Sequence, residues 1–315
     1  MTLSSAVETY VTLKQSLGAV FSVDARILCA FVRVVGDIPV NAITPALCTA
    51  FCRGKGPPTR FWSRKHEALR GLFRYLVGRG HLSHSPLPEP GPRIQSTFRR
   101  YIYGRDDLHR LLDAAARPVH PAALIQPHTL RLLLLVLYGT GLRAGEALRL
   151  RFCDVDVRDR LLTIWDTKFF KSRLVPIGIG LNKALAHYGS ERTRLPFADG
   201  ERSIFFATRT GQAISLGRLE HAFTRLLRQT RVGEGYAGHR PRLHDLRATF
   251  AVHRLITWYR EGADVQARLP LLSTYLGHLN VSATSTYLTM TAELLGEASQ
   301  RFERYALPTQ EHAHA

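Results

Sequence analysis

The sequence has few cysteines and no long hydrophobic run. Its 315 residues include four cysteines and two methionines. No pair of C-x-x-C units is present, so neither a structural zinc centre nor a disulfide framework is expected. The longest apolar run, Leu132–Tyr138, is much shorter than the roughly 18 residues of a membrane-spanning helix. These absences argue against a disulfide-rich secreted domain and against a helical membrane protein.

Acidic residues are scarce relative to basic ones. The chain has 25 Asp and Glu against 43 Lys and Arg, which gives a net charge of +18. A surplus this large predicts a polyanionic partner, with nucleic acid as the first candidate and an anionic membrane surface as the rival. The N-terminal MTLSSAVETY has neither the basic region nor the apolar core of a secretory signal. We therefore expect a cytoplasmic protein.

A proline-rich segment divides the chain. With 45% apolar and 22% charged residues, the chain can bury a core, and its length favours two domains. The SPLPEPGP segment, residues 85–92, contains four prolines and a glycine. This composition disfavours a helix and favours an extended connector. We expect a basic helical domain over 1–85, for which DNA contact is one interpretation of the charge and a solvated face the other, a linker over 86–99 and a second domain over 100–315. Within the first domain, Cys48 and Cys52 have the spacing of two buried thiols on one helix face.

Hydrophobic periodicity and turn signals predict a mainly α protein with a small antiparallel β-sheet. The first domain is expected to hold four helices, over residues 4–17, 22–35, 45–53 and 59–78. In the second domain we expect helices over 106–115, 128–139 and 143–150, short strands over 154–157, 161–165 and 172–176, and further helices over 181–188, 216–230, 245–260, 269–277 and 293–305.

The first cluster of residues that could take part in a reaction is the GTGLRAGE segment, which ends at Glu146. A glycine turn delivers Arg143 to the start of a helix, and Arg143 and Glu146 lie three residues apart on one face. Taken alone, this is typical of a surface ion pair. A nucleotide-binding loop fits poorly, because neither G-x-G-x-x-G nor G-x-x-x-x-G-K-[ST] is present.

Two further clusters carry imidazole and phenol groups. His244-Asp-Leu-Arg247 projects an imidazole and a guanidinium together, which suits a phosphodiester under attack, although a capping His with a salt-bridging Arg is the commoner arrangement. Tyr275-Leu-Gly277-His278 is followed nine residues later by Tyr287. A single tyrosine is most often a half-buried core residue, so neither cluster defines a function by itself.

The order and spacing of these clusters resemble the catalytic domain of the tyrosine recombinases, the phage integrase family. GTGLRAGEAL is similar to its first arginine box, HDLRATFA to its His-x-x-Arg box, and LGH followed by Tyr287 to its nucleophile box. TKFFKSRLVPI, residues 167–177, resembles the β-hairpin that carries the family's catalytic lysine. FRYLVGRGHLSHSP resembles the end of its core-binding domain, and LPLLSTYLGH resembles transposon-encoded members. The resemblance covers about residues 5–305.

The resemblance implies a site-specific DNA recombinase or integrase that cuts and rejoins strands through a 3′-phosphotyrosyl intermediate, without a cofactor or metal. The implied catalytic residues are Arg143, Lys168, His244, Arg247, His278 and Tyr287. The tyrosine is the nucleophile, the arginines and His278 hold the phosphate oxygens, His244 transfers the tyrosine proton, and the lysine protonates the leaving 5′ oxygen. Glu146 would orient Arg143.

Some alternatives remain open at this point. Phe169 and Phe170 stand where relatives often have glycine beside the lysine, and Lys171 lies close by, so either lysine can serve the leaving group; we assign Lys168. The implied partners are double-stranded DNA and further copies of the chain, which would form a tetramer on two DNA sites. Partner recombinases in the same assembly are a further option. A topoisomerase-like enzyme and a catalytically silent DNA-binding protein of the same fold are the alternative functions.

Overall fold

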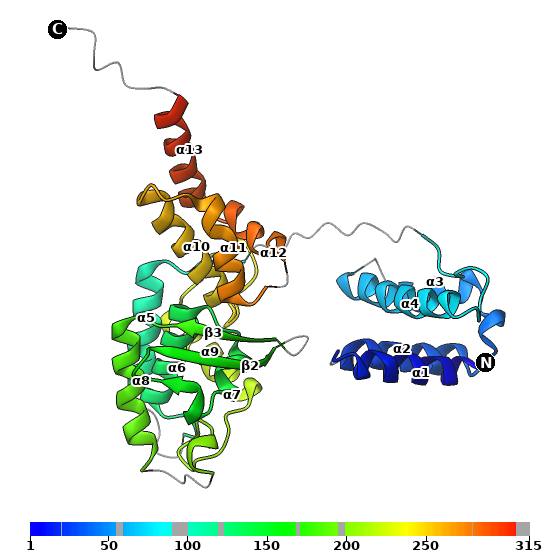
Figure 1. Cartoon of the computed structure of the whole chain (residues 1–315), viewed down its shortest axis with the longest axis horizontal. Helices are drawn as coiled ribbons and strands as arrows, with labels where there is room; N and C mark the ends of the chain where they lie inside the picture. Colours follow the sequence, from blue (N-terminus) through cyan, green and yellow to red (C-terminus); the bar gives the residue numbers. More distant parts are fainter. Residues whose placement is uncertain are drawn as a thin grey trace. The chain divides into compact units, whose positions relative to one another are not determined.

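The computed structural model of the chain forms two compact units (Figure 1). The structure describes residues 1–19, 21–54 and 59–89 of the first unit, and 100–118, 123–167, 171–194, 199–278 and 280–306 of the second. Residues 90–99, which hold most of the expected linker, lie outside the described residues.

The first unit contains the four expected helices, two on each side of a short 3₁₀ turn. They are α1 (Leu3–Ser16), α2 (Ser22–Val35), the turn η1 (Val40–Ala42), α3 (Pro45–Arg53) and α4 (Arg60–Gly78). Thr44 and Thr59 cap α3 and α4 through their side chains. The expected cap of the first helix at residue 4 or 5 is wrong, because Thr2 accepts the hydrogen bond from the backbone N–H of Ser5.

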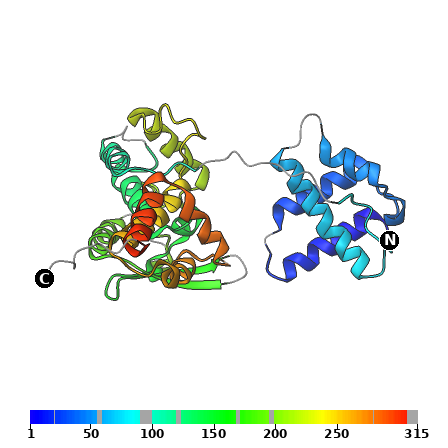
Figure 2. The same ribbon diagram turned by 90° about the horizontal axis from the view of Figure 1, so that it is seen from above.

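The four helices lie side by side (Figure 2), and their buried side chains form one apolar core. Leu69 and Leu72 of α4 have no exposed surface, and Cys48 and Cys52 are buried on one face of α3, as their spacing predicts. Leu87 is also buried in this core. Residues 86–89 were expected to belong to the linker, but they are part of the first unit because Leu87 packs there and the Glu89 carboxylate pairs with Arg70.

The second unit is mainly helical with a small sheet, and its element order follows the sequence prediction. Its elements are α5 (Arg105–Ala116), α6 (Pro127–Thr140), α7 (Ala144–Arg149), η2 (Phe152–Asp154), β1 (Val155–Asp156), β2 (Leu161–Thr167), β3 (Lys171–Pro176), α8 (Ile179–Arg192), η3 (Gly200–Arg202), α9 (Leu216–Thr230), α10 (Asp245–Arg260), α11 (Val265–Leu276), α12 (Ser282–Ser285), η4 (Thr286–Thr289) and α13 (Ala292–Ala306).

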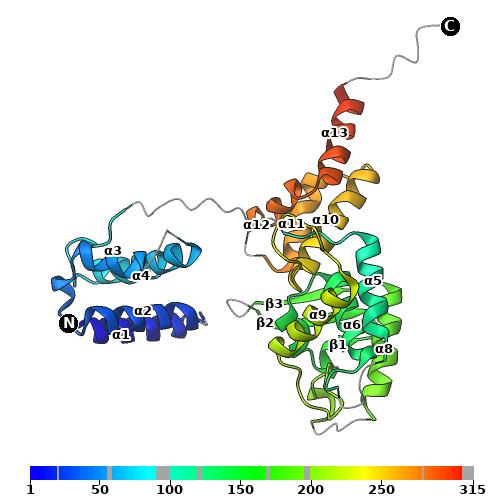
Figure 3. The same cartoon turned by 180° about the vertical axis from the view of Figure 1, so that it is seen from behind.

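The three strands form an antiparallel sheet in the order β1-β2-β3. Leu162 pairs with Val175 across β2 and β3, and both side chains are buried against the core. Leu174 and Trp165 lie on the other face and are exposed. Figures 1 and 3 both show α5 and α8 on the side of this unit away from the end where β2 stops at Thr167.

Several helices begin earlier than the sequence predicts, and for α5 and α11 the capping residue gives the reason. The N-cap of α5 is Gly104 rather than an aspartate, and Asp107 instead accepts a hydrogen bond from the Gly104 backbone N–H. α11 begins at Val265 because Asp264 caps it through the N–H of Ala267. The expected start at residue 269 is wrong, and Pro270 lies inside the helix.

The last helix, α13, packs against α10. Leu294 is almost fully buried there, and Arg260 of α10 pairs with both Glu293 and Glu297 of α13. The described residues contain no helix that is both long and apolar enough to cross a membrane.

Candidate active site

Arg143 is placed by the sharp turn that ends α6. Gly141 adopts the left-handed conformation with φ +62°, and a Cβ there would lie 2.6 Å from the ring of Phe250. Only glycine fits this position without displacing the ring. The chain then reverses, and Arg143 becomes the N-cap of α7, with its side chain partly exposed.

Glu146 holds Arg143 and a second arginine that the sequence analysis missed. The Arg143 guanidinium donates to Glu146 Oε1 at 2.7 Å, and its backbone N–H donates to Oε2 at 3.0 Å. Arg173 of β3 donates to the same Oε2 at 2.7 Å. Burial alone would raise the pKa of the Glu146 carboxyl, but the hydrogen bonds and charge of Arg173 and Arg143 outweigh it and lower the pKa to about 2. The carboxylate is therefore ionised and shared.

Arg247 is buried on α10, with 2% of its surface exposed. Its guanidinium donates to two main-chain carbonyls, those of Gly141 and Leu276, at 2.7 Å each. These carbonyls lie where α6 and α11 end, so both helix C-termini face the cation. Burial and the neighbouring charge of Arg143 lower the pKa of Arg247 to about 10, which leaves it positively charged at neutral pH.

His278 and Tyr287 lie together after the turn that ends α11. Gly277 has φ +70°, and a Cβ there would approach the Arg173 guanidinium to 2.7 Å. His278 Nδ1 is hydrogen-bonded to the hydroxyl of Thr284 at 2.7 Å, and Thr284 is fully buried. The rings of His278 and Tyr287 stack with centroids 6.0 Å apart. Tyr287, on η4, has 4% of its surface exposed.

His244 is the N-cap residue of α10 and keeps contact with solvent. Desolvation by its surroundings, together with the positive charges of Arg100, Arg247 and other arginines, lowers the pKa of its imidazole to about 4. Burial, together with the positive charges of Arg247 and Arg143, lowers the pKa of the His278 imidazole to about 4. Both imidazoles are therefore neutral at pH 7 in the free protein.

The structure brings together five of the six residues that the sequence analysis selected. Arg143 also donates to the Gly277 carbonyl at 3.3 Å, which ties the first arginine turn to the turn before His278. The sixth residue, Lys168, lies outside the described residues. The backbone of Lys171, at the start of β3, is paired with that of Thr167 at the end of β2. The five placed residues are Arg143, His244, Arg247, His278 and Tyr287.

Arg173 could not be selected from a motif. It stands in β3, 27 residues after Glu146, and its role depends on the strand register that pairs it with Ile164. Its Nε also donates to the Tyr275 carbonyl at 3.0 Å. The sequence gives no signal for this partner, because Arg173 stands in a mixed strand, KSRLVP, directly after a lysine and a serine.

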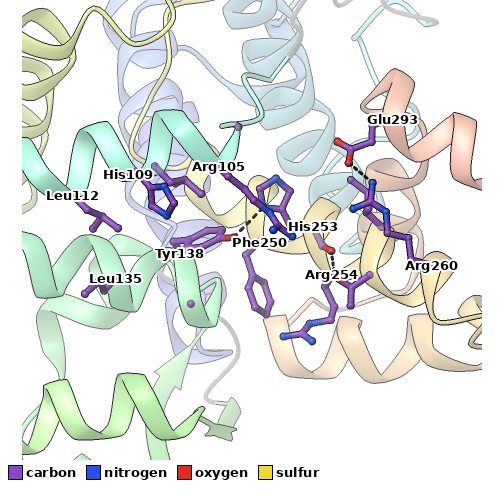
Figure 4. A pocket seen from close by; sticks show the side chains of 15 residues that line it. Arg105, His109, Leu112, Leu135, Tyr138, Phe250, His253, Arg254, Arg260 and Glu293 are labelled. Carbon is purple, nitrogen blue, oxygen red and sulfur yellow. Dashed lines mark hydrogen bonds and ion pairs between the residues drawn. The ribbon is translucent and has the colours of Figure 1, made fainter.

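A cavity of about 570 Å³ is lined by residues of α5, α6 and α10 (Figure 4). Its lining includes Phe250, whose ring also contacts the Gly141 turn, and Tyr138, whose hydroxyl is hydrogen-bonded to His253 Nδ1 at 3.0 Å. None of the five placed residues lines it. Among the described residues, no group of three His, Cys, Asp or Glu side chains is arranged to hold a metal ion.

The lowered histidine pKa values predict proton uptake when a phosphate binds. Between pH 4 and the ordinary histidine value of 6.5, the unfolded chain holds more protons at His244 and His278 than the folded chain. Their contribution to stability is therefore complete above pH 6.5 and declines as the pH falls toward 4. A bound anion raises both pKa values, so DNA binding in this window should take up protons. Calorimetry in buffers of different ionisation enthalpy measures the uptake, and a zero value contradicts the placement of both rings at a phosphate.

Comparisons with known proteins place the chain in a family. Residues 104–293 match the phage integrase family. A putative integrase/recombinase, y4rE of Sinorhizobium fredii, is 34% identical over 300 residues, which cover 95% of each chain. The tyrosine recombinase XerD of Listeria innocua is 27% identical over 255 residues, 80% of this chain and 79% of XerD.

Solved structures show the same fold. The Tn1549 transposon integrase in complex with a circular intermediate DNA has a TM-score of 0.72 at 15% identity, over 97% of this chain and 99% of that one. A lambda integrase tetramer bound to a Holliday junction has a TM-score of 0.66 at 20% identity, over 91% of this chain and 77% of that one.

Together, the fold and the relatives define an enzyme that breaks and rejoins DNA strands in site-specific recombination. The chain belongs to the phage integrase family.

Proposed function

We propose that Tyr287 is the nucleophile of this recombinase and that the reaction proceeds through a 3′-phosphotyrosyl intermediate. The tyrosine oxygen forms a bond to the scissile phosphorus, the bond from phosphorus to the 5′ oxygen breaks, and the 5′ oxygen leaves with a proton. The phosphotyrosine retains the phosphodiester energy, so rejoining by a DNA 5′ hydroxyl needs no nucleotide cofactor.

The observation that carries this proposal is the charge balance around Tyr287. Arg143, Arg173 and Arg247 bring three positive charges, and Glu146 brings one negative charge. These four residues together carry two net positive charges, and both histidines are neutral. A phosphodiester has one negative charge in the ground state and gains a second in the transition state of attack. Fixed cations of this number stabilise the transition state more than the bound substrate.

The remaining roles are those that the resemblance implies, and the surroundings of the placed residues support them. Arg143 and Arg247 bind the two nonbridging oxygens. With the Thr284 hydroxyl donating to Nδ1, neutral His278 carries its proton on Nε2 and donates it to the same phosphate. His244, neutral and in contact with solvent, accepts the tyrosine proton. The sequence pattern supports Lys168 as the acid for the leaving 5′ oxygen.

The partners follow from the family and the charge. We assign double-stranded DNA as the substrate, with the first unit as the core-binding domain and 100–315 as the catalytic domain. A tetramer on two DNA sites is supported by the lambda integrase tetramer on a Holliday junction. Partner recombinases are compatible with this arrangement. We place the protein in the cytoplasm, where chromosomal or element DNA of a prokaryotic cell is accessible.

The test of this function is covalent capture. Incubation with labelled, nicked duplexes from the DNA that flanks the gene should yield a protein–DNA adduct of increased mass, and peptide mapping should locate it at Tyr287. An adduct without exchange between two sites would indicate topoisomerase-like relaxation. Absence of any adduct, with normal DNA binding, would indicate the catalytically silent alternative.

Arg173 is a positioning residue in this proposal, because it acts through Glu146. Without its second cation, the Glu146 carboxylate binds Arg143 alone and the Arg143 guanidinium shifts. We expect Arg173→Ala to slow cleavage by roughly tenfold to hundredfold, the scale of a displacement near 1 Å. DNA affinity should change little, and Arg173→Lys should restore part of the rate.

The matched control for this substitution is Leu174→Ala, one residue further along β3 with its side chain exposed. Single-turnover cleavage and equilibrium DNA binding are measured for each variant. If Arg173→Ala lowers binding and cleavage in parallel, or if Arg173→Lys is as slow as Arg173→Ala, the positioning role is wrong.

A further inference from the structure

A second surface of unusual composition lies next to the active site, between α7, η2, β2 and η3. A cavity of about 430 Å³ is lined there by Arg149, Arg151, Trp165 and Arg202, together with Cys153. We call these five residues the Trp165 surface. All five are exposed.

Trp165 is a large apolar side chain that water contacts over 58% of its surface. Its indole N–H donates to Asp154 Oδ1 at 2.7 Å. Asp154 is itself buried, and its other oxygen accepts the backbone N–H of Arg151 at 2.8 Å. The ring is therefore held in one orientation although no core covers it, so it presents a flat apolar face at low entropic cost for binding.

The three arginines around the ring carry uncompensated charge. In the stretches of chain that the structure describes, no carboxylate forms an ion pair with Arg149, Arg151 or Arg202. The two acids that line the cavity, Glu146 and Asp154, are both buried and engaged by other groups. The solvent-facing charge of the surface is therefore entirely positive.

The backbone under this surface is rigid. Phe205 donates its N–H to the Leu150 carbonyl at 2.8 Å, and Phe152 donates to the Ser203 carbonyl at 3.2 Å. These bonds fix the segment of Arg151 against the segment that follows Arg202. The main-chain positions from which Arg151 and Arg202 project are therefore fixed relative to each other.

The surface is also continuous with the catalytic groups. Glu146 lines the cavity and binds Arg143 at the same time. Two residues after Trp165, β2 stops at Thr167, immediately before the segment that holds Lys168. A ligand on this surface therefore lies beside the position of the scissile phosphate.

We propose that the Trp165 surface binds the DNA backbone adjacent to the cleavage position, with the three arginines on phosphates and the indole face against a deoxyribose. Guanidinium groups bind phosphates through charge-assisted hydrogen bonds, and aromatic faces bind nucleotides without sequence preference. The inference rests on the proposed function, because it adds a binding surface to the same site. The surface sets affinity and register, whereas the reaction itself is carried by the groups around Tyr287.

The decisive experiment measures how salt weakens DNA binding, in a Tyr287→Phe background that forms no adduct. The probe is a short random-sequence duplex. Each phosphate contact contributes about −0.9 to the slope of log affinity against log salt concentration. The triple variant Arg149→Ala, Arg151→Ala, Arg202→Ala should therefore make the slope shallower by about 2.7, and its affinity should fall at least tenfold at moderate salt.

The matched control removes three other exposed arginines that line none of these sites, Arg117, Arg131 and Arg158. It changes the net charge equally, and we expect a slope close to that of the parent. Trp165→Ala should weaken binding by roughly fivefold to a hundredfold, the range for loss of one aromatic platform, without a change of slope. Trp165→Phe, which keeps an aromatic face, should lose less.

Cys153 supplies an independent footprint. In a Cys29→Ser background it is the exposed cysteine that remains among the described residues, and saturating duplex should slow its alkylation. Equal slopes for the two triple variants, or alkylation unaffected by DNA, overturns the inference. Loss of oligomer formation with unchanged DNA affinity assigns the surface to protein contacts and overturns it as well. Adduct formation by the wild-type protein is scored separately, so a failed catalytic assignment is distinguishable from a failed binding surface.

Discussion

Replacing Tyr287 by Phe should abolish the covalent protein–DNA adduct while leaving DNA affinity nearly unchanged. The substitution removes one oxygen, the atom that bonds to phosphorus, and keeps the buried ring that stacks with His278. No other side chain among the placed residues can form the same ester. Denaturing gels of a labelled suicide substrate measure the adduct, and fluorescence anisotropy measures binding.

The control for this variant is Tyr275→Phe, which also removes one hydroxyl from the same region. The Tyr275 hydroxyl donates to the Pro176 carbonyl at 3.1 Å, away from the phosphate position. The Tyr275→Phe variant should therefore form the covalent adduct at the same yield as the wild-type protein. An adduct that survives Tyr287→Phe would falsify the assignment of the nucleophile.

Arg143→Ala and Arg247→Ala should each slow cleavage by about 10³-fold or more, the scale for removal of a charged donor from such a transition state. The two variants should differ in stability. Arg143 is 39% exposed in its side chain, whereas Arg247 is buried and satisfies two carbonyls. Loss of Arg247 leaves those acceptors without their donor, at a cost of about 1–3 kcal/mol each at most.

Two further variants keep this prediction decisive. Arg247→Lys retains the charge and one donor, so it should fold better than Arg247→Ala and still cleave far more slowly than the wild type. Arg254→Ala removes an exposed arginine seven residues later on α10, at the rim of the cavity in Figure 4, and should cleave normally. Losses below tenfold for both Arg143→Ala and Arg247→Ala would mean that these arginines are structural.

Local sequence signals predicted most of the architecture. The threonines before α3 and α4 act as caps, and the β-prone run expected over 161–165 forms most of β2. These features depend on residues within one turn or one strand, where propensity and periodicity operate. The glycine turn that presents Arg143 is of the same local kind.

The contacts that assemble the site could not be predicted in this way. The Glu146 carboxylate meets Arg173 because β3 has a particular register, and Arg247 meets the Leu276 carbonyl because α10 crosses the end of α11. Both partners are distant in sequence and neither pairing leaves a periodic signal. The start of α5 was misplaced for a related reason, since two aspartates follow Gly104 and either satisfies the usual capping pattern.

The burial of Tyr287 has a consequence for the fate of the cut DNA. The ester formed on this side chain would occupy the same enclosed position, where only 4% of the residue's surface meets solvent. Hydrolysis of a phosphotyrosine requires an aligned water molecule. Rejoining requires only that a DNA 5′ hydroxyl attack the phosphotyrosine, either the hydroxyl that was released from it or the one released from a second strand. Restricted water access therefore lengthens the lifetime of the intermediate and directs it toward ligation. This partition between water and DNA as acceptor is what separates a recombinase from a nuclease.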